Sequence, residues 1–202
     1  GNFGEKEILD LVKVGVFQPN GENFDPQKPI TRAEFIEWLV KSNNLIRRKK
    51  DFIRTADAGS PSSFTDLTES NPYFKYIQGM ADAGWSIGFT DKTFRPDQAL
   101  TREQMIGIKT PIDWNNETYD NYHTKFWTDG AKISKTFIRP MSTEAFAFYE
   151  EKHNNNWSRL FGKTRICNPQ KPVSRAEAAV CVWCIGRNPT DGYSAAKGTP
   201  AE

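Results

Sequence analysis

The sequence predicts an all-α protein built from three similar helix–loop–helix units. The first observation behind this prediction is a five-residue phrase written three times, as ITRAE at 30–34, LTREQ at 100–104 and VSRAE at 173–177. The second is that apolar residues recur at helical spacing before and after each phrase, whereas strand-like alternation is weak throughout. Internal repeats of this kind indicate units that bury their apolar faces against one another.

Each phrase has the composition of a helix start. A hydroxyl residue at the second position can accept a hydrogen bond from a free amide of the first turn. A Glu or Gln follows three residues later, which completes a capping box in every copy. The predicted caps are Thr31, Thr101 and Ser174, and their partners are Glu34, Gln104 and Glu177.

Another helix is expected before each phrase. Apolar spacing predicts helices at 7–14 and 73–83, and in the third unit a helix that begins at Ser142 as its cap. The segment WSRLFG at 157–162 is expected to form a further short turn. Between the two helices of units one and two, Asn, Asp and Gly form a turn, and a Pro stops the helix from running through it.

The bulk composition sets limits on function. The chain has 202 residues, a net charge of +2 and 14 Phe and 6 Trp, which suffice for a packed core. The balanced charge gives no reason to expect a nucleic-acid partner. No run of about 18 apolar residues is present, so no transmembrane span is expected.

These patterns predict one array of three units and no separate second domain. Unit one is placed at residues 3–46, a linker at 47–62, unit two at 63–112, an insertion at 113–125, unit three at 126–187 and a C-terminal tail at 188–202.

The combination of an apolar helix, a Gly-x-x-Asp-x-x-Phe-x-Pro turn and a Thr-Arg-Ala-Glu helix resembles the S-layer homology domain. The leading SFTD at 63–66 and its echo FWTD at 126–129 strengthen the resemblance. It implies three units in a pseudo-threefold prism with long inter-unit loops. The phrases IQGMADAG, LTREQMIGIKTPID and NPQKPVSRAEAA are similar to the branch found in cyanobacteria and plastids.

The resemblance also implies candidate binding residues. S-layer homology domains usually bind anionic, often pyruvylated, wall polysaccharide, and the Arg of the repeated phrase contributes to those sites. Carried over, these positions are Arg32, Arg102 and Arg175, joined by the neighbouring loop residues Asn20, Gly21, Trp85, Asp91 and Thr93. The alternative is that each Arg pairs with a carboxylate of the adjacent unit and holds the prism together, and that Trp85 is buried in the core and does not stack on a sugar.

Two further features have weaker readings. The basic run Arg47, Arg48, Lys49 and Lys50 is either a solvated linker or a docking patch for an anionic surface.

The CVWC segment lies too deep in an apolar helix for a redox pair and lacks the second pair that zinc requires, so core packing is expected. His123 and His153 fall in no catalytic or metal motif. We therefore expect no metal, no cofactor and no enzymatic activity.

Two functions remain open at this stage. The first is a protein–protein adaptor in a membrane-associated assembly of a plastid or cyanobacterial thylakoid, with a protein complex at a membrane surface as partner. The alternative is an anchor at a bacterial cell envelope that binds anionic wall polysaccharide.

Overall fold

A computed structural model describes residues 2–18, 23–47, 49–85, 87–120, 123–150 and 155–187, and within these ranges the protein is all-helical without a β-strand. The α-helices are α1 (Glu5–Lys13), α2 (Arg32–Ile46), α3 (Phe74–Asp82), α4 (Arg102–Asp113), α5 (His123–Phe126), α6 (Ile138–Glu150), α7 (Asn156–Phe161) and α8 (Arg175–Val182). Three 3₁₀ turns lie at Lys49–Asp51, Gly130–Lys132 and Lys135–Phe137. The expected all-α class is confirmed.

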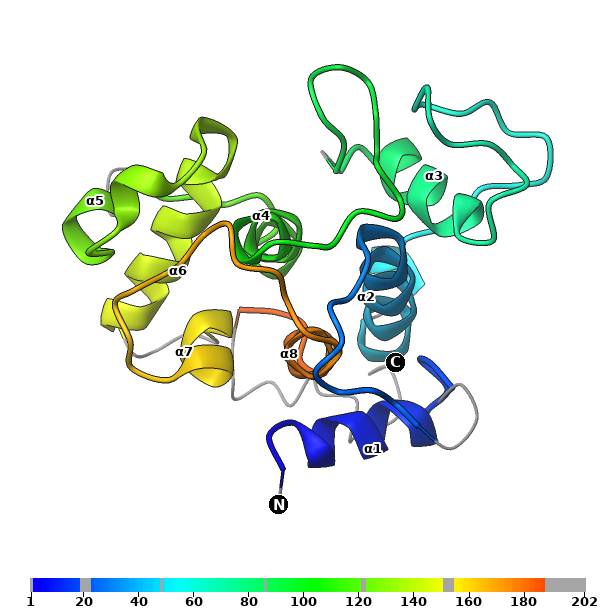
Figure 1. The fold of residues 1–202 in the computed structure, drawn as a ribbon. Coiled ribbons are helices and arrows are strands. Elements are labelled where there is room, and N and C mark those ends of the chain that lie inside the picture. Colours follow the sequence, from blue (N-terminus) through cyan, green and yellow to red (C-terminus); the bar gives the residue numbers. More distant parts are fainter. Residues whose placement is uncertain are drawn as a thin grey trace.

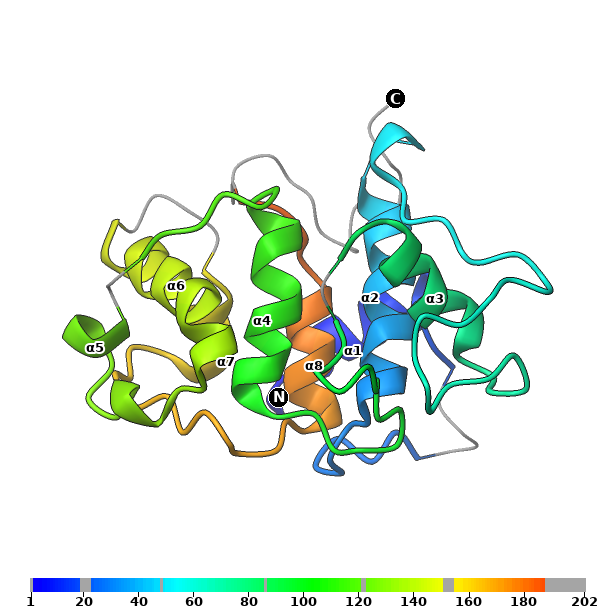
Figure 2. The same cartoon turned by 90° about the horizontal axis from the view of Figure 1, so that it is seen from above.

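The three helices that begin at the repeated phrase form the centre of the molecule. Figures 1 and 2 show α2, α4 and α8 with their first turns at the same end. Each unit's earlier helix packs on the capped helix of the preceding unit, so that α3 lies on α2 and α6 lies on α4. The first helix α1 packs on the last helix α8, which closes the array into a ring of units.

A small ring of backbone hydrogen bonds links the segments that precede α2, α4 and α8 at this end. The residue before each N-cap donates its amide to the equivalent carbonyl of another unit. Ile30 donates to Val173 at 3.0 Å, Leu100 to Ile30 at 3.0 Å, and Val173 to Leu100 at 2.8 Å. All three side chains are fully buried. The cycle returns to its starting residue, so no unit can shift along its axis without breaking two of the bonds.

The turn before each capped helix has the same backbone form in all three units. Asp25, Arg95 and Asn168 each adopt a positive φ and each precedes a proline. In unit two, Asp66 accepts from the amides of Phe94 at 2.8 Å and Arg95 at 2.7 Å. In the third unit Asp129 accepts at 2.8 Å from the amides of both Cys167 and Asn168. The third turn keeps this geometry although its sequence lacks the aspartate-rich pattern.

Several predicted elements need correction. Ser142 is not an N-cap, because α6 begins at Ile138 and Ser142 is buried inside the helix. Helix α1 covers Glu5–Lys13 rather than 7–14, and α3 covers Phe74–Asp82 rather than 73–83. The expected short turn at WSRLFG is present as α7, which Asn155 caps by accepting from Ser158.

Candidate functional site

Complete capping boxes form at Thr31 and Ser174, whereas at Thr101 only the Gln104 half forms, because Thr101 Oγ1 has no hydrogen-bond partner among the described residues. Thr31 and Ser174 accept from the amides of Glu34 and Glu177, each at 3.2 Å. In this second box, the Thr101 amide donates to Gln104 Oε1 at 3.3 Å.

The first-turn amides that a helix start could offer to an anion are already bonded. Carbonyls of the neighbouring unit's proline turn accept from them in each copy. The pairs are Arg32 to Gln98, Ala33 to Pro96, Arg102 to Lys171, Glu103 to Pro169, Arg175 to Lys28 and Ala176 to Pro26. These amides are therefore not available to a ligand, because they already hold neighbouring segments together.

Two of the repeated arginines form ion pairs between units. Arg175 Nη1 lies 2.6 Å from Glu34 Oε1, and its Nε donates to the Phe24 carbonyl at 3.0 Å. Arg102 Nη2 lies 3.2 Å from Glu177 Oε1, and its guanidinium carbon is 3.7 Å from the Phe161 ring centroid. In both cases the carboxylate belongs to the capping box of the next unit.

Arg32 occupies the same position but lacks such a carboxylate. The corresponding capping residue in unit two is the neutral Gln104. Arg32 instead donates to the carbonyls of Phe94 at 2.8 Å and Ile87 at 2.5 Å. Its guanidinium lies 4.5 Å from the Phe89 ring centroid, and the residue is 2% exposed. Burial, together with the nearby charge of Arg95, lowers the pKa of Arg32 to about 10.

The turn beside Arg32 carries Asp91, Thr93 and an arginine that sequence reasoning did not single out. Arg95 lies over Phe89 at 4.0 Å from the ring centroid and pairs with Asp91 at 2.8 Å. The side chains of Arg95 and Asp91 are 44% and 51% exposed. Asp91 also accepts from the amide and hydroxyl of Thr93, and these bonds hold its pKa at about 2. The sequence signal available for Arg95 was its place in the turn TDKTFRPD at 90–97, directly before Pro96.

Trp85 lies in a different place from Asp91 and Thr93. It lines a hollow of about 170 Å³ together with Arg47 and Lys50, at the C-terminal ends of α2 and α4. We call this the Trp85 hollow. Two separately predicted features, the loop Trp and the basic run, therefore meet at one site. Arg48, Asn20 and Gly21 lie outside the described residues, and the exposed Lys49 does not line the hollow.

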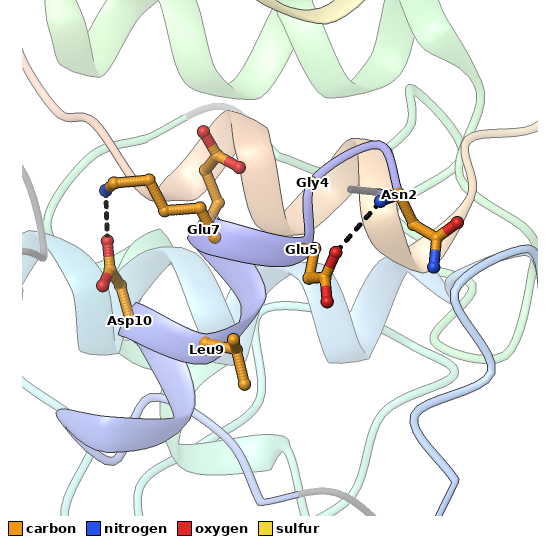
Figure 3. A pocket seen from close by; sticks show the side chains of 7 residues that line it. Asn2, Gly4, Glu5, Glu7, Leu9 and Asp10 are labelled. Carbon is orange, nitrogen blue, oxygen red and sulfur yellow. Dashed lines mark hydrogen bonds and ion pairs between the residues drawn. The ribbon is translucent and has the colours of Figure 1, made fainter.

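Two larger hollows have an acidic lining. One, of about 460 Å³, lies over the first turns of α1, where Glu5, Glu7 and Asp10 outnumber Lys6 (Figure 3). Leu9 lies at its edge and is 63% exposed. The other, of about 320 Å³, is lined by Asp57, Glu69 and Lys75. Both linings repel an anion, because their carboxylates exceed their cations.

The cysteines show no arrangement for redox or metal chemistry within the described ranges. Cys181 is fully buried in α8, and burial raises the pKa of its thiol to about 12. Cys167 donates its Sγ hydrogen to Asp129 Oδ1 at 3.1 Å. No group of three or more potential metal ligands occurs in this part of the chain. His123 begins α5, whereas His153 lies outside the described residues.

A buried charge network joins α4, α6 and α7. Lys109 and Asp113 of α4 form an ion pair in which neither side chain is exposed. Asp113 also accepts from Asn156 Nδ2 and from the Gly186 amide, each at 2.8 Å. Asn156 donates at 2.8 Å to Glu144 as well, and Thr110 donates to the same carboxylate at 2.9 Å. This network fixes the helices of the third unit onto α4.

We expect Glu144 to make stability depend on pH. Burial raises its pKa, and the charge of Asp113 acts in the same direction. The native state therefore holds a proton that the unfolded chain releases above about pH 4.3. The stability from this group is complete below that pH and is lost as pH rises through the higher, native pKa. Urea unfolding from pH 4.5 to 8 should show wild type losing stability relative to Glu144→Gln as pH rises. Parallel curves would contradict the raised pKa.

The geometry defines an all-helical module whose units are closed on one another by ring, cap and arginine contacts. Residues 2–36 and 63–106 match the family model described as S-layer homology domain. The chain is also similar to an endoglucanase of Bacillus sp. (strain KSM-635), with 25% identity over 198 residues. That similarity covers 96% of this chain and 19% of the endoglucanase, so the chain spans about a fifth of this relative's length. No described helix has the length and apolarity needed to cross a bilayer.

Proposed function

We propose that the chain is a non-catalytic S-layer homology module that holds its protein at a cell envelope by binding anionic wall polysaccharide. The two matched segments support the family, and the family resemblance implies the ligand. The endoglucanase similarity is confined to about a fifth of that enzyme, which fits a docking module joined to a larger protein. We include residues 126–187 as the third unit, because the Ser174 cap, the Val173 ring bonds and the Asp129 turn repeat the geometry of unit two.

The observation that carries this proposal is the exposed Arg95 at the one junction where the buried repeated Arg, Arg32, has no ion-pair carboxylate among the described residues. The two counterparts of Arg32 are neutralised by Glu34 and Glu177, whereas Arg32 has only carbonyl and ring partners among the described residues. The exposed Arg95 brings a second guanidinium to the same junction. Its pair with Asp91 is solvent-exposed, and such pairs contribute at most about 1 kcal/mol, so an incoming carboxylate can compete for Arg95. Asp66 and Asp91 already carry negative charge at this junction, so an anionic group would bind at the exposed edge of Arg95.

Glycoside hydrolysis is not part of the proposal. A glycosidase places two carboxyl groups on either side of the scissile bond, where substrate and water can reach them. The described chain does bring two carboxylates together at Asp113 and Glu144, which share the Asn156 amide. Both are buried in the packed interior, so a sugar chain cannot reach them.

The test is a binding measurement with purified pyruvylated wall polysaccharide. Wild type is expected to bind in a pulldown, more weakly at high salt and not at all to polysaccharide stripped of its pyruvyl groups. Arg95→Gln should weaken binding about tenfold, because it removes one charge-assisted hydrogen-bond donor. Arg139→Gln is the matched control, because Arg139 also forms an exposed pair, with Asp120 at 2.9 Å. Failure of wild type to bind the pyruvylated material would refute the proposal.

A protein–protein adaptor is the second candidate. The observation in its favour is that Arg102 and Arg175 are occupied by inter-unit ion pairs, which leaves their charges unavailable to a polysaccharide. The comparisons name no plastid or thylakoid protein, so that location and the cyanobacterial branch stay predictions. Co-purification with a membrane protein complex, unaffected by added polysaccharide, would favour the adaptor over the anchor.

A further inference from the structure

We propose that the Trp85 hollow is a subsite for one carboxylate-bearing sugar residue, separate from the arginine positions of the repeated phrase. The inference rests on the proposed polysaccharide-binding function and gives it a second contact point. The hollow is lined by residues that include Asn43, Arg47, Lys50, Asp51, Trp85 and Asn115.

Charge distinguishes this hollow from the two acidic ones. The lining of the Trp85 hollow contains two cations, Arg47 and Lys50, and one carboxylate, Asp51, so its net charge is +1. The lining of the hollow over α1 has a net charge of −2, because it contains Glu5, Glu7 and Asp10 and one cation, Lys6. The hollow at Asp57 and Glu69, with Lys75, carries −1. An anionic ligand is therefore attracted to the Trp85 hollow and repelled by the other two.

The lining offers the groups that hold a sugar acid. Trp85 is half-buried, packs against the core and lines the hollow, and a Trp side chain can make both an apolar contact through its ring and a polar contact through its indole N–H. Lys50 is exposed and forms no ion pair within the described ranges. Arg47 donates one N–H to the Ile112 carbonyl at 3.1 Å, which orients its guanidinium at the end of α4. Asp51 can accept from sugar hydroxyls.

The basic side of the hollow is held in place before any ligand binds. Asn43 Nδ2 donates to the Asp51 carbonyl at 3.1 Å. Asn44 makes a two-way contact with Ile53, donating to its carbonyl and accepting from its amide, both at 2.9 Å. These bonds fix residues 51–53 against α2, so the neighbouring Lys50 starts from a restrained backbone. Such preorganisation lowers the entropy lost on binding.

Size and position favour one sugar residue of a longer chain. The volume of about 170 Å³ lies below the roughly 300 Å³ at which pockets for drug-sized ligands begin. Trp85 is two residues from Ile87, whose carbonyl accepts from Arg32. The hollow and the Arg32 junction therefore share one connecting segment. Two linked contact points raise the avidity of a polymeric ligand without new contacts at either one.

The experiment compares two variants with two matched controls. Lys50→Gln and Trp85→Ala alter the hollow, with Trp85→Phe added to keep an aromatic ring if the alanine variant folds poorly. The two controls are Lys132→Gln, which removes an exposed cation far from the hollow in sequence, and Trp183→Ala, which removes another half-buried Trp. Affinity for the pyruvylated polysaccharide is measured by calorimetry. Binding of methyl glucuronide, with methyl glucoside as the uncharged probe, is followed through the tryptophan indole signals in NMR.

We expect Lys50→Gln and Trp85→Ala each to weaken polysaccharide binding about tenfold and both controls to match wild type. Methyl glucuronide should shift the Trp85 indole signal, and methyl glucoside should shift it far less. If wild type binds the polysaccharide and the Lys50 and Trp85 variants bind it equally well, the subsite is wrong and the proposed function stands. If wild type does not bind the polysaccharide, the proposed function falls and the subsite falls with it.

Discussion

Replacing Asp113 with alanine is expected to lower the free energy of unfolding by about 3–5 kcal/mol. The change leaves the Lys109 ammonium without its carboxylate in a place where neither side chain is exposed. It also removes the acceptor for Asn156 and for the Gly186 amide, which are buried donors. Urea unfolding followed by tryptophan fluorescence measures the loss.

Asp120→Ala is the matched control for this prediction. Asp120 also pairs with a cation, Arg139, but the two side chains are 52% and 66% exposed. An exposed pair contributes only about 0–1 kcal/mol, so the control should remain close to wild type. Equal losses in the two variants would show that burial of the Lys109 pair does not matter, contrary to the prediction.

Replacing Arg32 with alanine is expected to cost about 3 kcal/mol of stability, since two buried acceptors lose their donor at about 1–3 kcal/mol each. The carbonyls of Ile87 and Phe94 both accept from Arg32, and its guanidinium fills the space against Phe89 and Phe94. The contact joins units one and two, so its loss should loosen that junction. Thermal unfolding and hydrogen exchange of the segment around Phe94 provide the measurement.

Arg95→Ala provides the comparison at the same junction. Arg95 stacks on the same Phe89 ring, but its side chain is 44% exposed, so its loss should cost no more than about 1 kcal/mol. The two positions thus separate stability from binding. Arg32→Ala tests how much the contact between units one and two stabilises the fold, and the Arg95 variants test polysaccharide affinity. A stable, fully folded Arg32→Ala protein would contradict the structural role assigned to this guanidinium.

Local chemistry made the helix starts predictable. A hydroxyl residue followed three positions later by Glu or Gln defines its own hydrogen bonds, and Thr31 and Ser174 form them as expected. Helices α1 and α3 were located to within two residues from apolar spacing alone. The predicted start of α6 at Ser142 was wrong. Serine is a residue type that often caps helices, but here the helix begins at Ile138 and Ser142 is buried within it.

The candidate site was predicted less completely, because its residues act across units. The two alternatives for the repeated Arg could not be separated by residue type, since an Arg bonds equally well to a sugar acid or to a neighbouring Glu. The distinction at Arg32 follows from one neutral residue, Gln104, which lies 72 positions away in the chain (104 − 32). Likewise, the Trp85 hollow joins a loop Trp to a basic run only because the fold brings Arg47, which follows α2, to the Ile112 carbonyl at the end of α4.

The sequence by itself determined that the chain is helical, where three helices begin and which family it resembles, because capping and periodicity depend on residues within one turn. Only the tertiary structure decided how the three phrases are used. The Ile30, Leu100 and Val173 amides close a ring, and the first-turn amides donate to neighbouring carbonyls. Those bonds join groups more than sixty residues apart in the chain, so their partners are set by packing of the whole core.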